Sequence, residues 1–273
     1  MKIPFKGFYL SYKQILNNKK NKKAVLLFHG FTGSSKDWEE TAKNISKDFN
    51  IYMLDLIGHG ESDSPDDAEF YITESIVEQI HKLVKTFKEE KIFLLGYSMG
   101  GRAAINFAIK YQNTLTGLIL ESTFAGIVKN SEREDRILSD EKLAKFIKSH
   151  SIEEFVDYWM NLDLFKSQRT LPQEILKEVR EEKLKNNKTG LANSLISFGA
   201  GKMLPVYSSL QNISIKTLLI SGELDKKYAE INSKMSKVFP DARHLIIKNT
   251  GHNSHLENPT EFTSELNKFL SGF

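Results

Sequence analysis

The sequence predicts an α/β fold, built on a mostly parallel sheet with helices on both faces. Apolar runs typical of strands buried on both faces, such as AVLLF at 24–28 and IFLLG at 92–96, alternate with segments of helical periodicity. Several of these runs end in a glycine-rich or polar turn, as the carboxyl ends of parallel strands do at ligand sites. The 273 residues, 40% of them hydrophobic, suffice for one large core with an insertion.

Composition excludes several classes of protein. Because the chain has no cysteine, it has no disulfide, thiol nucleophile or thiolate metal site. The N-terminus lacks the apolar region of a signal peptide, and no apolar run reaches membrane-spanning length, so we expect a cytoplasmic protein without stable membrane insertion. A balanced net charge of +3 gives no indication of nucleic acid binding. The basic run 17–23 is interpreted as a solvated hairpin turn rather than a polyanion site.

The first half of the chain begins with two expected strands, 5–16 and 24–28, and the second leads into His29-Gly30. We interpret His29 as a loop histidine that binds backbone. An amphipathic helix over 37–47 and a buried strand over 51–56 follow.

The strand over 51–56 runs into the sequence D-x-x-G-H-G-x-S. Its acid and its histidine, Asp55 and His59, are interpreted as structural, because a loop so rich in glycine is typical of tight backbone geometry.

The next helix, expected over 73–88, has one apolar face and precedes Gly96-Tyr-Ser98-Met-Gly100. G-x-S-x-G is a weak pattern by itself. Between a buried strand and a helix, however, it predicts a sharp turn, the nucleophile elbow, that exposes the serine hydroxyl as a nucleophile. The start of the following helix, which runs to about Tyr111, offers free N–H groups where an oxyanion could develop.

The second half of the chain continues with a strand over 115–120 that ends in Glu121. From 126 to 210 the pattern is helical without a convincing strand, which predicts a lid over the carboxyl ends of the strands. Strands then return, each followed by a polar group: 215–221 precedes Asp225, and 244–247 precedes His252. A last helix is expected over 259–270.

Three polar residues therefore each follow a predicted strand and could form a catalytic triad: Ser98, Asp225 and His252. In this arrangement the histidine is the base and the acid orients it. Asp225 could instead only cap the helix that begins at residue 226. His255 is a competing base, and Glu121 and Glu223 are alternative acids. No cluster of His, Asp or Glu has the spacing of metal ligands, so no metal is expected.

Arginine gives a further indication. The chain has only six arginines among 38 basic residues, and five of the six lie beside Ser98 or in the helical segment. Because lysine is the usual cation elsewhere, these arginines favour bidentate recognition of carboxylates. The alternative is ion pairing with acids of the same segment, such as Glu134 or Asp140.

The order Ser98, Asp225, His252 resembles that of the α/β-hydrolase superfamily. Within it, nearly the whole chain is similar to the 2-succinyl-6-hydroxy-2,4-cyclohexadiene-1-carboxylate synthase family of menaquinone (vitamin K2) biosynthesis. The motifs that carry this resemblance are G-Y-S-M-G-G-R (96–102), E-S-T (121–123), E-R-x-x-R-x-x-x-D (132–140), L-x-L-F-x-S-Q-x-x-L-P (162–172), G-L-A-x-S-L (190–195), G-E-x-D (222–225) and T-G-H (250–252). Departures occur at Ile196, Leu204 and Tyr207, where the family often has arginine, proline and tryptophan.

This resemblance implies an α/β-hydrolase fold with a mostly parallel eight-stranded sheet, a core over 1–125 and 211–273, and a helical lid over 126–210 inserted after strand 6. It implies an oxyanion hole made by the backbone N–H groups of Phe31 and Met99.

The implied reaction is that of a carbon–oxygen lyase, which eliminates pyruvate from 2-succinyl-5-enolpyruvyl-6-hydroxy-3-cyclohexene-1-carboxylate. Ser98, His252 and Asp225 act as the base, and no cofactor is needed. The expected partner is a small-molecule polycarboxylate, and the oligomeric state is unknown. The expected substrate-binding residues are Arg102, Tyr97, Arg133, Arg136 and Trp159.

Two other functions stay open: a carboxylesterase or thioesterase acting on a small anionic acyl substrate, and a non-catalytic ligand-binding member of the fold.

Overall fold

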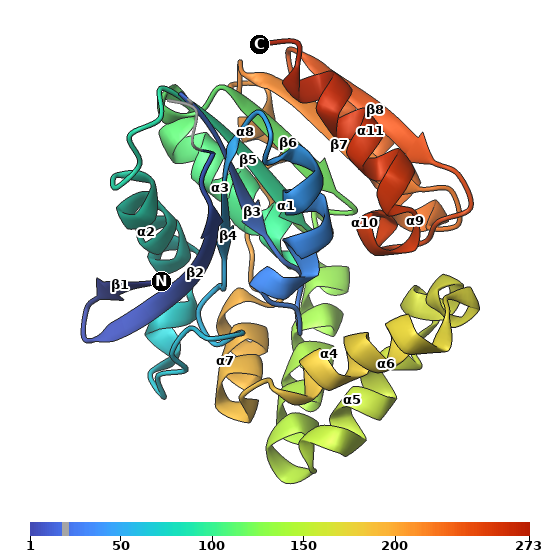
Figure 1. Ribbon diagram of the computed structural model, residues 1–273. Coiled ribbons are helices and arrows are strands. Elements are labelled where there is room, and N and C mark those ends of the chain that lie inside the picture. The colour runs from blue at the N-terminus through green and yellow to red at the C-terminus, as the bar shows by residue number, and fades with distance from the viewer. Residues whose placement is uncertain (18–21) are drawn as a thin grey trace.

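The computed structural model describes residues 1–17 and 22–273, and its centre is one eight-stranded sheet in the order β1-β2-β4-β3-β5-β6-β7-β8 (Figure 1). The α/β-hydrolase fold and the eight-stranded sheet are thus confirmed. Strands β3 to β8 pair in parallel, and the first two strands are antiparallel to their neighbours. The strands are β1 (Lys2–Phe5), β2 (Phe8–Ile15), β3 (Lys23–Phe28), β4 (Asn50–Leu54), β5 (Lys91–Tyr97), β6 (Gly117–Glu121), β7 (Lys216–Gly222) and β8 (Ala242–Ile247).

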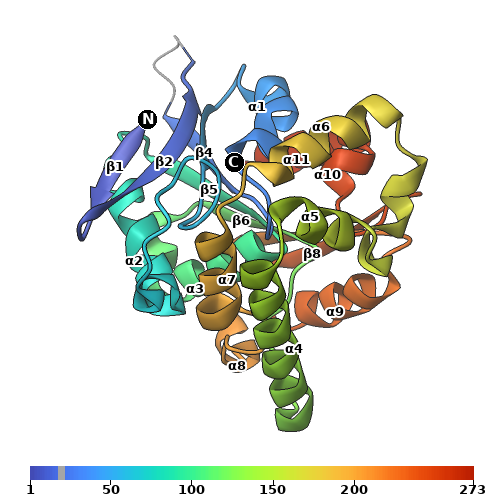
Figure 2. The same ribbon diagram turned by 90° about the horizontal axis from the view of Figure 1, so that it is seen from below.

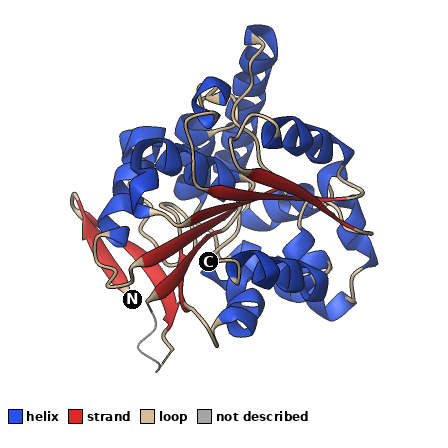
Figure 3. Ribbon diagram, turned by 90° about the horizontal axis from the view of Figure 1, so that it is seen from above, coloured by secondary structure: helices blue, strands red, loops and turns tan. Residues whose placement is uncertain are grey.

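Helices cover both faces of the sheet (Figure 3). The sequence of strand β3 is continuously apolar because both of its faces are buried. Leu26 and Phe28 pack into one buried cluster, while Val25 and Leu27 pack into the other. The first cluster includes residues of α2 (Thr73–Val84), α3 (Met99–Tyr111) and α9 (Lys226–Ser236). The second includes residues of α1 (Glu39–Ile45) and α11 (Pro259–Leu270). Short helical turns are η1 (Ser35–Trp38), η2 (Ala68–Tyr71), η3 (Gln112–Thr114), η4 (Asp163–Thr170) and α10 (Ser254–Glu257).

The first expected strand, 5–16, is wrong at its start. The strand there is β2, which begins at Phe8, and it forms a hairpin with the unexpected strand β1, with Lys6 and Gly7 between them at φ of 40° and 94°. A two-residue turn with both φ angles positive matches the twist of paired strands, and it favours glycine. The expected hairpin turn in the basic run 17–23 lies largely outside the described residues. The strands on its two sides, β2 and β3, both pair with β4 and not with each other, so they do not form the expected hairpin.

Five helices follow β6 and precede β7, as the helical pattern predicted: α4 (Asn130–Ser149), α5 (Ile152–Met160), α6 (Gln173–Leu184), α7 (Lys188–Phe198) and α8 (Tyr207–Leu210). Helices α4 to α7 lie together at one side of the sheet (Figures 1 and 2). They contact the loops that follow strands, because Asn186 binds the carbonyl of Thr32 and Asn193 binds that of Pro65. Their action as a lid, and the boundaries 126–210, remain predictions.

No helix in the described ranges is long and apolar enough to span a membrane.

Candidate active site

Ser98 lies on the turn between β5 and α3. Its backbone has φ 50° and ψ −106°, a conformation that residues other than glycine rarely adopt. The turn is tight because α3 approaches the end of β3 closely. A Cβ atom on Gly100 would lie 2.5 Å from the carbonyl oxygen of Phe28 and 2.6 Å from that of His29. Only glycine fits there, which explains the G-x-S-x-G pattern in physical terms.

Ser98, His252 and Asp225 form one chain of hydrogen bonds. The Nε2 atom of His252 lies 3.0 Å from the Oγ atom of Ser98, and its Nδ1 atom lies 2.7 Å from Oδ2 of Asp225. An ionised carboxylate only accepts hydrogen bonds, so Nδ1 carries the proton and Nε2 is free to accept the serine proton. His252 and Asp225 are both buried. This arrangement is suited to remove a proton by way of the serine oxygen.

Asp225 also caps helix α9, because its Oδ1 atom accepts a hydrogen bond from the backbone N–H of Tyr228 at 3.3 Å. The carboxylate of Asp225 therefore makes the contact that each interpretation from sequence requires, helix cap through Oδ1 and histidine partner through Oδ2, and its role as the triad acid remains a prediction.

Glu121 and His255 bind each other. His255 Nδ1 lies 2.6 Å from Oε2 of Glu121, and the backbone N–H of His255 donates to Oε1 at 3.0 Å. Both side chains are buried, and the ring of His255 stacks on Trp38 with 4.0 Å between centroids. His255, the competing base, and Glu121, one alternative acid, thus form a hydrogen bond with each other. Glu223, the other alternative acid, accepts a hydrogen bond from the backbone N–H of Asn249.

The backbone N–H groups expected to form an oxyanion hole lie beside Ser98. Met99 is the first residue of α3, Phe31 follows β3, and both residues line the same cavity as Ser98. Across residues 1–17 and 22–273, neither N–H group donates to a protein acceptor. Both are therefore available to a ligand oxygen, as an oxyanion hole requires.

The cavity above Ser98 measures about 100 Å³. Its lining combines Ser98 and His252 with two arginines, several aromatic rings, and aliphatic or small residues. The indole N–H of Trp159 is buried here without a hydrogen-bond partner in the described structure. The lining residues include Phe31, Tyr97, Ser98, Met99, Arg102, Phe124, Arg136, Trp159, Phe165, Phe198, Tyr228 and His252.

Arg102 is buried at this cavity, with 6% of its surface exposed. It donates from Nη1 to the carbonyl oxygen of Phe198 at 2.6 Å, and its guanidinium lies 4.5 Å from the centroid of the Phe198 ring. Burial, and then the charge of Arg136, lower the pKa of Arg102 to about 10. In the part of the chain that the structure describes, no carboxylate lies within ion-pair distance of it.

Arg136 both lines the cavity and pairs with Asp140, with 2.8 Å between Nε and Oδ1. The ion pair left open as an alternative from sequence is therefore present, and it does not remove Arg136 from the cavity. Arg133 lies one turn earlier on α4 and is not among the lining residues, so this geometry gives its expected binding role no support.

The two histidines of the glycine-rich loops are structural, as the sequence indicated. His29 accepts from the N–H of Leu56 at 3.0 Å and contacts the carbonyl of Gly30 at 2.7 Å. Asp55 accepts from the N–H groups of Ser35 and Glu61. His59 is fully buried beside His29, and burial is the main cause that lowers its pKa to about 3.

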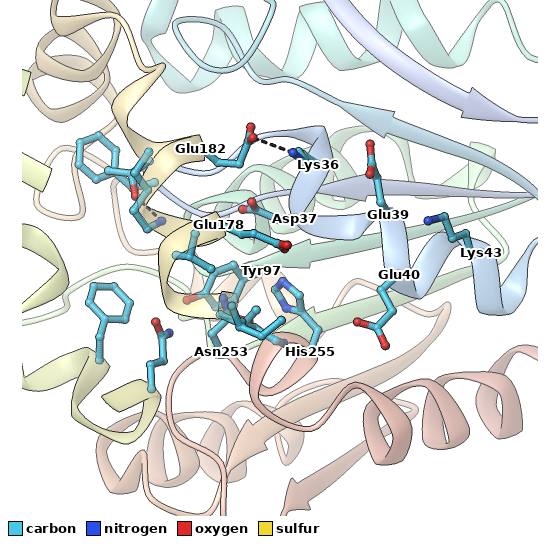
Figure 4. Close-up of a pocket in the computed structure, with 18 residues that line it drawn as sticks. Lys36, Asp37, Glu39, Glu40, Lys43, Tyr97, Glu178, Glu182, Asn253 and His255 are labelled. Carbon is cyan, nitrogen blue, oxygen red and sulfur yellow. Dashed lines mark hydrogen bonds and ion pairs between the residues drawn. The ribbon is translucent and has the colours of Figure 1, made fainter. Parts of the chain in front are cut away.

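A second cavity of about 430 Å³ lies next to the first, between α6 and the segment from η1 to α1. Figure 4 shows Lys36 paired with Glu182 at this cavity, and Tyr97 beside His255. Phe31, Tyr97 and Phe165 line both cavities. Sequence reasoning missed this cavity, as it missed Tyr228 in the first, because neither has a motif of its own.

Comparisons with known proteins agree with the geometry. A family model described as alpha/beta hydrolase fold matches residues 23–259. A Bacillus subtilis (strain 168) protein, provisionally named 2-succinyl-6-hydroxy-2,4-cyclohexadiene-1-carboxylate synthase, is 40% identical over 91% of this chain and 90% of that protein. The synthase of this name from Enterobacter sp. (strain 638) is 26% identical, with 90% and 91% covered. The solved structure of MenH from S. aureus has a TM-score of 0.93 and 33% identity, covering 96% of this chain and 98% of that one.

His59 makes the fold sensitive to acid. Because its pKa in the folded protein is about 3, while an unfolded histidine titrates near 6.5, the unfolded state binds the extra proton between these values. The free energy of unfolding should therefore fall as the pH drops below 6.5, by up to about 1.4 kcal/mol per pH unit from this residue. When the free energy of unfolding is measured with denaturant from pH 7 to 4, it should depend less steeply on pH in His59→Asn than in the wild type. Equal slopes would contradict the assignment.

The triad geometry predicts a ranking of three variants. Ser98→Ala and Asp225→Asn should lower kcat by about 10³- to 10⁴-fold with folding intact, Asp225→Asn by favouring the wrong imidazole tautomer. Glu121→Gln, the matched control, should cost about 1–3 kcal/mol of stability through the buried bond to His255, and should spare most of kcat. Turnover and unfolding measured together check this. A greater loss of kcat in Glu121→Gln than in Asp225→Asn would show that the acid is misassigned.

Proposed function

The chain belongs to the α/β-hydrolase fold family and, within it, to the 2-succinyl-6-hydroxy-2,4-cyclohexadiene-1-carboxylate synthases, and we propose that it catalyses the reaction of that name. It is a lyase of menaquinone biosynthesis, which eliminates pyruvate from 2-succinyl-5-enolpyruvyl-6-hydroxy-3-cyclohexene-1-carboxylate. Its substrate is a small polycarboxylate, and we propose that it acts in the cytoplasm.

The observation that carries the proposal is the buried charge of Arg102. A buried guanidinium is costly unless it meets an anion, and none is within ion-pair distance in the described chain. A substrate carboxylate in the cavity would supply that anion. A neutral ester would leave the charge unpaired, so the site favours a substrate with carboxylates over a neutral acyl substrate.

The proposed chemistry uses the triad as a base. His252 takes the proton of Ser98, and the serine oxygen takes a proton from the carbon next to the succinyl ketone. The N–H groups of Phe31 and Met99 stabilise the enolate oxygen that forms. Electrons return from the enolate to form a double bond between ring carbons 2 and 3, the existing double bond shifts from carbons 3 and 4 to carbons 4 and 5, and the bond between carbon 5 and the enolpyruvyl oxygen breaks. The released enolpyruvate takes up a proton to become pyruvate.

The remaining polar groups of the cavity fit the binding of a polycarboxylate. Arg136 lines the cavity while paired with Asp140, and it brings a second guanidinium. Trp159 lines the same cavity as the two arginines, and Tyr97 lines both cavities. We therefore assign substrate binding to Arg102, Arg136, Trp159 and Tyr97, and keep Arg133 as a weaker candidate.

The test of this function is release of pyruvate from the cyclohexene substrate, followed by coupled oxidation of NADH with lactate dehydrogenase. A panel of short neutral and anionic esters and thioesters is measured beside it. If the protein is a lyase, we expect kcat/KM for pyruvate release to be far above kcat/KM for the hydrolysis of every ester. Ester hydrolysis without pyruvate release would assign the same triad to acyl transfer instead.

Arg102 variants separate the lyase from an esterase. Arg102→Ala removes a charge-assisted contact worth roughly 2–4 kcal/mol, so kcat/KM for pyruvate release should fall ~30- to 1,000-fold. Arg102→Lys should recover only part of this, because an ammonium keeps the charge and loses the planar fork. Hydrolysis of a neutral ester, measured in the same preparations, should hardly change. Equal losses on both substrates would make Arg102 structural.

Arg102 should also lower the stability of the ligand-free protein. Its pKa is about 10 when folded and higher when unfolded, so protonation favours the unfolded state at every pH below about 10. Arg102→Met, which keeps the length of the side chain, should leave the free energy of unfolding unchanged or raise it by up to about 3 kcal/mol. Denaturant melts at pH 7 check this sign, and a clear loss of stability would contradict it.

A further inference from the structure

Tyr228 is a polar group at the triad cavity that neither the elbow nor the triad accounts for. It lies in the first turn of α9, where Asp225 fixes its backbone N–H. Its backbone carbonyl accepts from the side chain of Asn232 at 2.9 Å, and Asn232 also binds the carbonyl of Thr123. Thr123 in turn donates to the carbonyl of Ser98 at 2.8 Å. The backbone of Tyr228 is therefore held by the same network as the nucleophile.

The ring of Tyr228 is also fixed. Its centroid lies 4.5 Å from that of His252 and 6.2 Å from that of Phe124, and the residue is buried. An aromatic ring held on two sides cannot move its hydroxyl away from the cavity without losing these contacts. The position of the oxygen is thus set before any ligand binds.

The hydroxyl of Tyr228 has no hydrogen-bond partner within the described protein. Through residues 1–17 and 22–273, it donates to no acceptor and accepts from no donor, although its residue lines the cavity with Ser98 and Arg102. The protein does not close off this oxygen, because it is not among the fully buried side-chain atoms that lack a partner. An accessible hydroxyl on a cavity-lining residue, without a partner in the described protein, is available to a ligand.

The charges around Tyr228 indicate what that ligand is. Burial raises the pKa of Tyr228 above 10, with the nearby Asp225 charge acting in the same direction, so the hydroxyl remains a neutral donor at physiological pH. Arg136 and Arg102 oppose this shift, which means that both guanidinium groups lie close enough to favour a negative charge at this position. An O–H donor near two guanidiniums is suited to bind the oxygen of a carboxylate.

We propose that the hydroxyl of Tyr228 donates a hydrogen bond to a substrate carboxylate, as a third anion-binding group beside Arg102 and Arg136. This inference rests on the proposed function, and it deepens it by naming a residue that determines specificity. The two arginines supply charge, while the hydroxyl supplies direction, because a single O–H bond is satisfied only when the carboxylate is at one place. A phenylalanine here would keep the packing on His252 and lose only this bond.

The experiment compares Tyr228→Phe with wild type and with Tyr9→Phe, whose ring is half exposed on strand β2 far from the cavity lining. Three quantities are measured: kcat/KM for pyruvate release, the rate at which a fluorophosphonate labels Ser98, and protection of Ser98 from that label by succinate or by neutral succinamide. Labelling reports on the triad alone, and protection reports on carboxylate binding without turnover.

We expect Tyr228→Phe to lower kcat/KM for pyruvate release roughly 10- to 100-fold, the value of one hydrogen bond to a charged group. The labelling rate should be unchanged, protection by succinate should weaken, and succinamide should be without effect in every protein. Tyr9→Phe should match wild type throughout. This pattern would also exclude misfolding of the variant, because an intact labelling rate requires an intact elbow.

Two results would overturn the inference. A parallel fall of labelling and pyruvate release would mean that Tyr228 only positions His252, and an unchanged kcat/KM with unchanged protection would mean that its hydroxyl binds nothing. Failure of the proposed function is distinguishable, because wild type would then release no pyruvate. Succinate protection alone would decide the role of Tyr228 in that case, with equal protection in both proteins counting against it.

Discussion

The close approach of helix α3 to the end of strand β3 is the packing constraint on which the site depends. Gly100 lies against the carbonyl groups of Phe28 and His29, and a single methyl group there would separate the two elements. This contact holds Ser98 in its strained conformation and brings the N–H of Met99 to the cavity that the loop at Phe31 also lines. It also sets the direction of α3, which carries Arg102 one turn further into the same cavity.

The second determinant is electrostatic. Within the described chain, Arg102 is held by a carbonyl oxygen and an aromatic ring, both of which tolerate a guanidinium without neutralising it. Arg136 keeps its own acid, Asp140, while it still lines the cavity. Tyr228 adds a hydroxyl without a partner. The side chains that line the cavity thus provide an excess of positive charge and hydrogen-bond donors. An anionic substrate would compensate this charge, and binding specificity would then be gained at the expense of stability.

Sequence patterns predicted what local rules determine. A strand buried on both faces must be apolar throughout, and a serine on a sharp turn needs glycine neighbours. Strands β3 and β5 and the elbow could therefore be predicted from the sequence. The hairpin at Lys6-Gly7 was missed because apolar residues continue on both sides of it. The bond between Glu121 and His255 was not predicted, because His252 and His255 follow the same strand only three residues apart and the sequence does not show which of them reaches Glu121. Likewise, only the rotation of α4 decides that Arg136, and not Arg133, lines the cavity.

If the unpaired charge of Arg102 makes this cavity a carboxylate site, equilibrium binding should depend on the charge of the ligand. In the Ser98→Ala background, which should bind without turnover, calorimetric titration with the cyclohexene substrate and with its fully methylated ester compares an anion with a neutral molecule of nearly the same shape. We expect saturable binding of the substrate, with one site per chain, and at least about tenfold weaker binding of the ester, equivalent to about 1.4 kcal/mol. Replacement of Arg102 by methionine should abolish most of this difference. Equal affinity for the two ligands when Arg102 is present would contradict the claim.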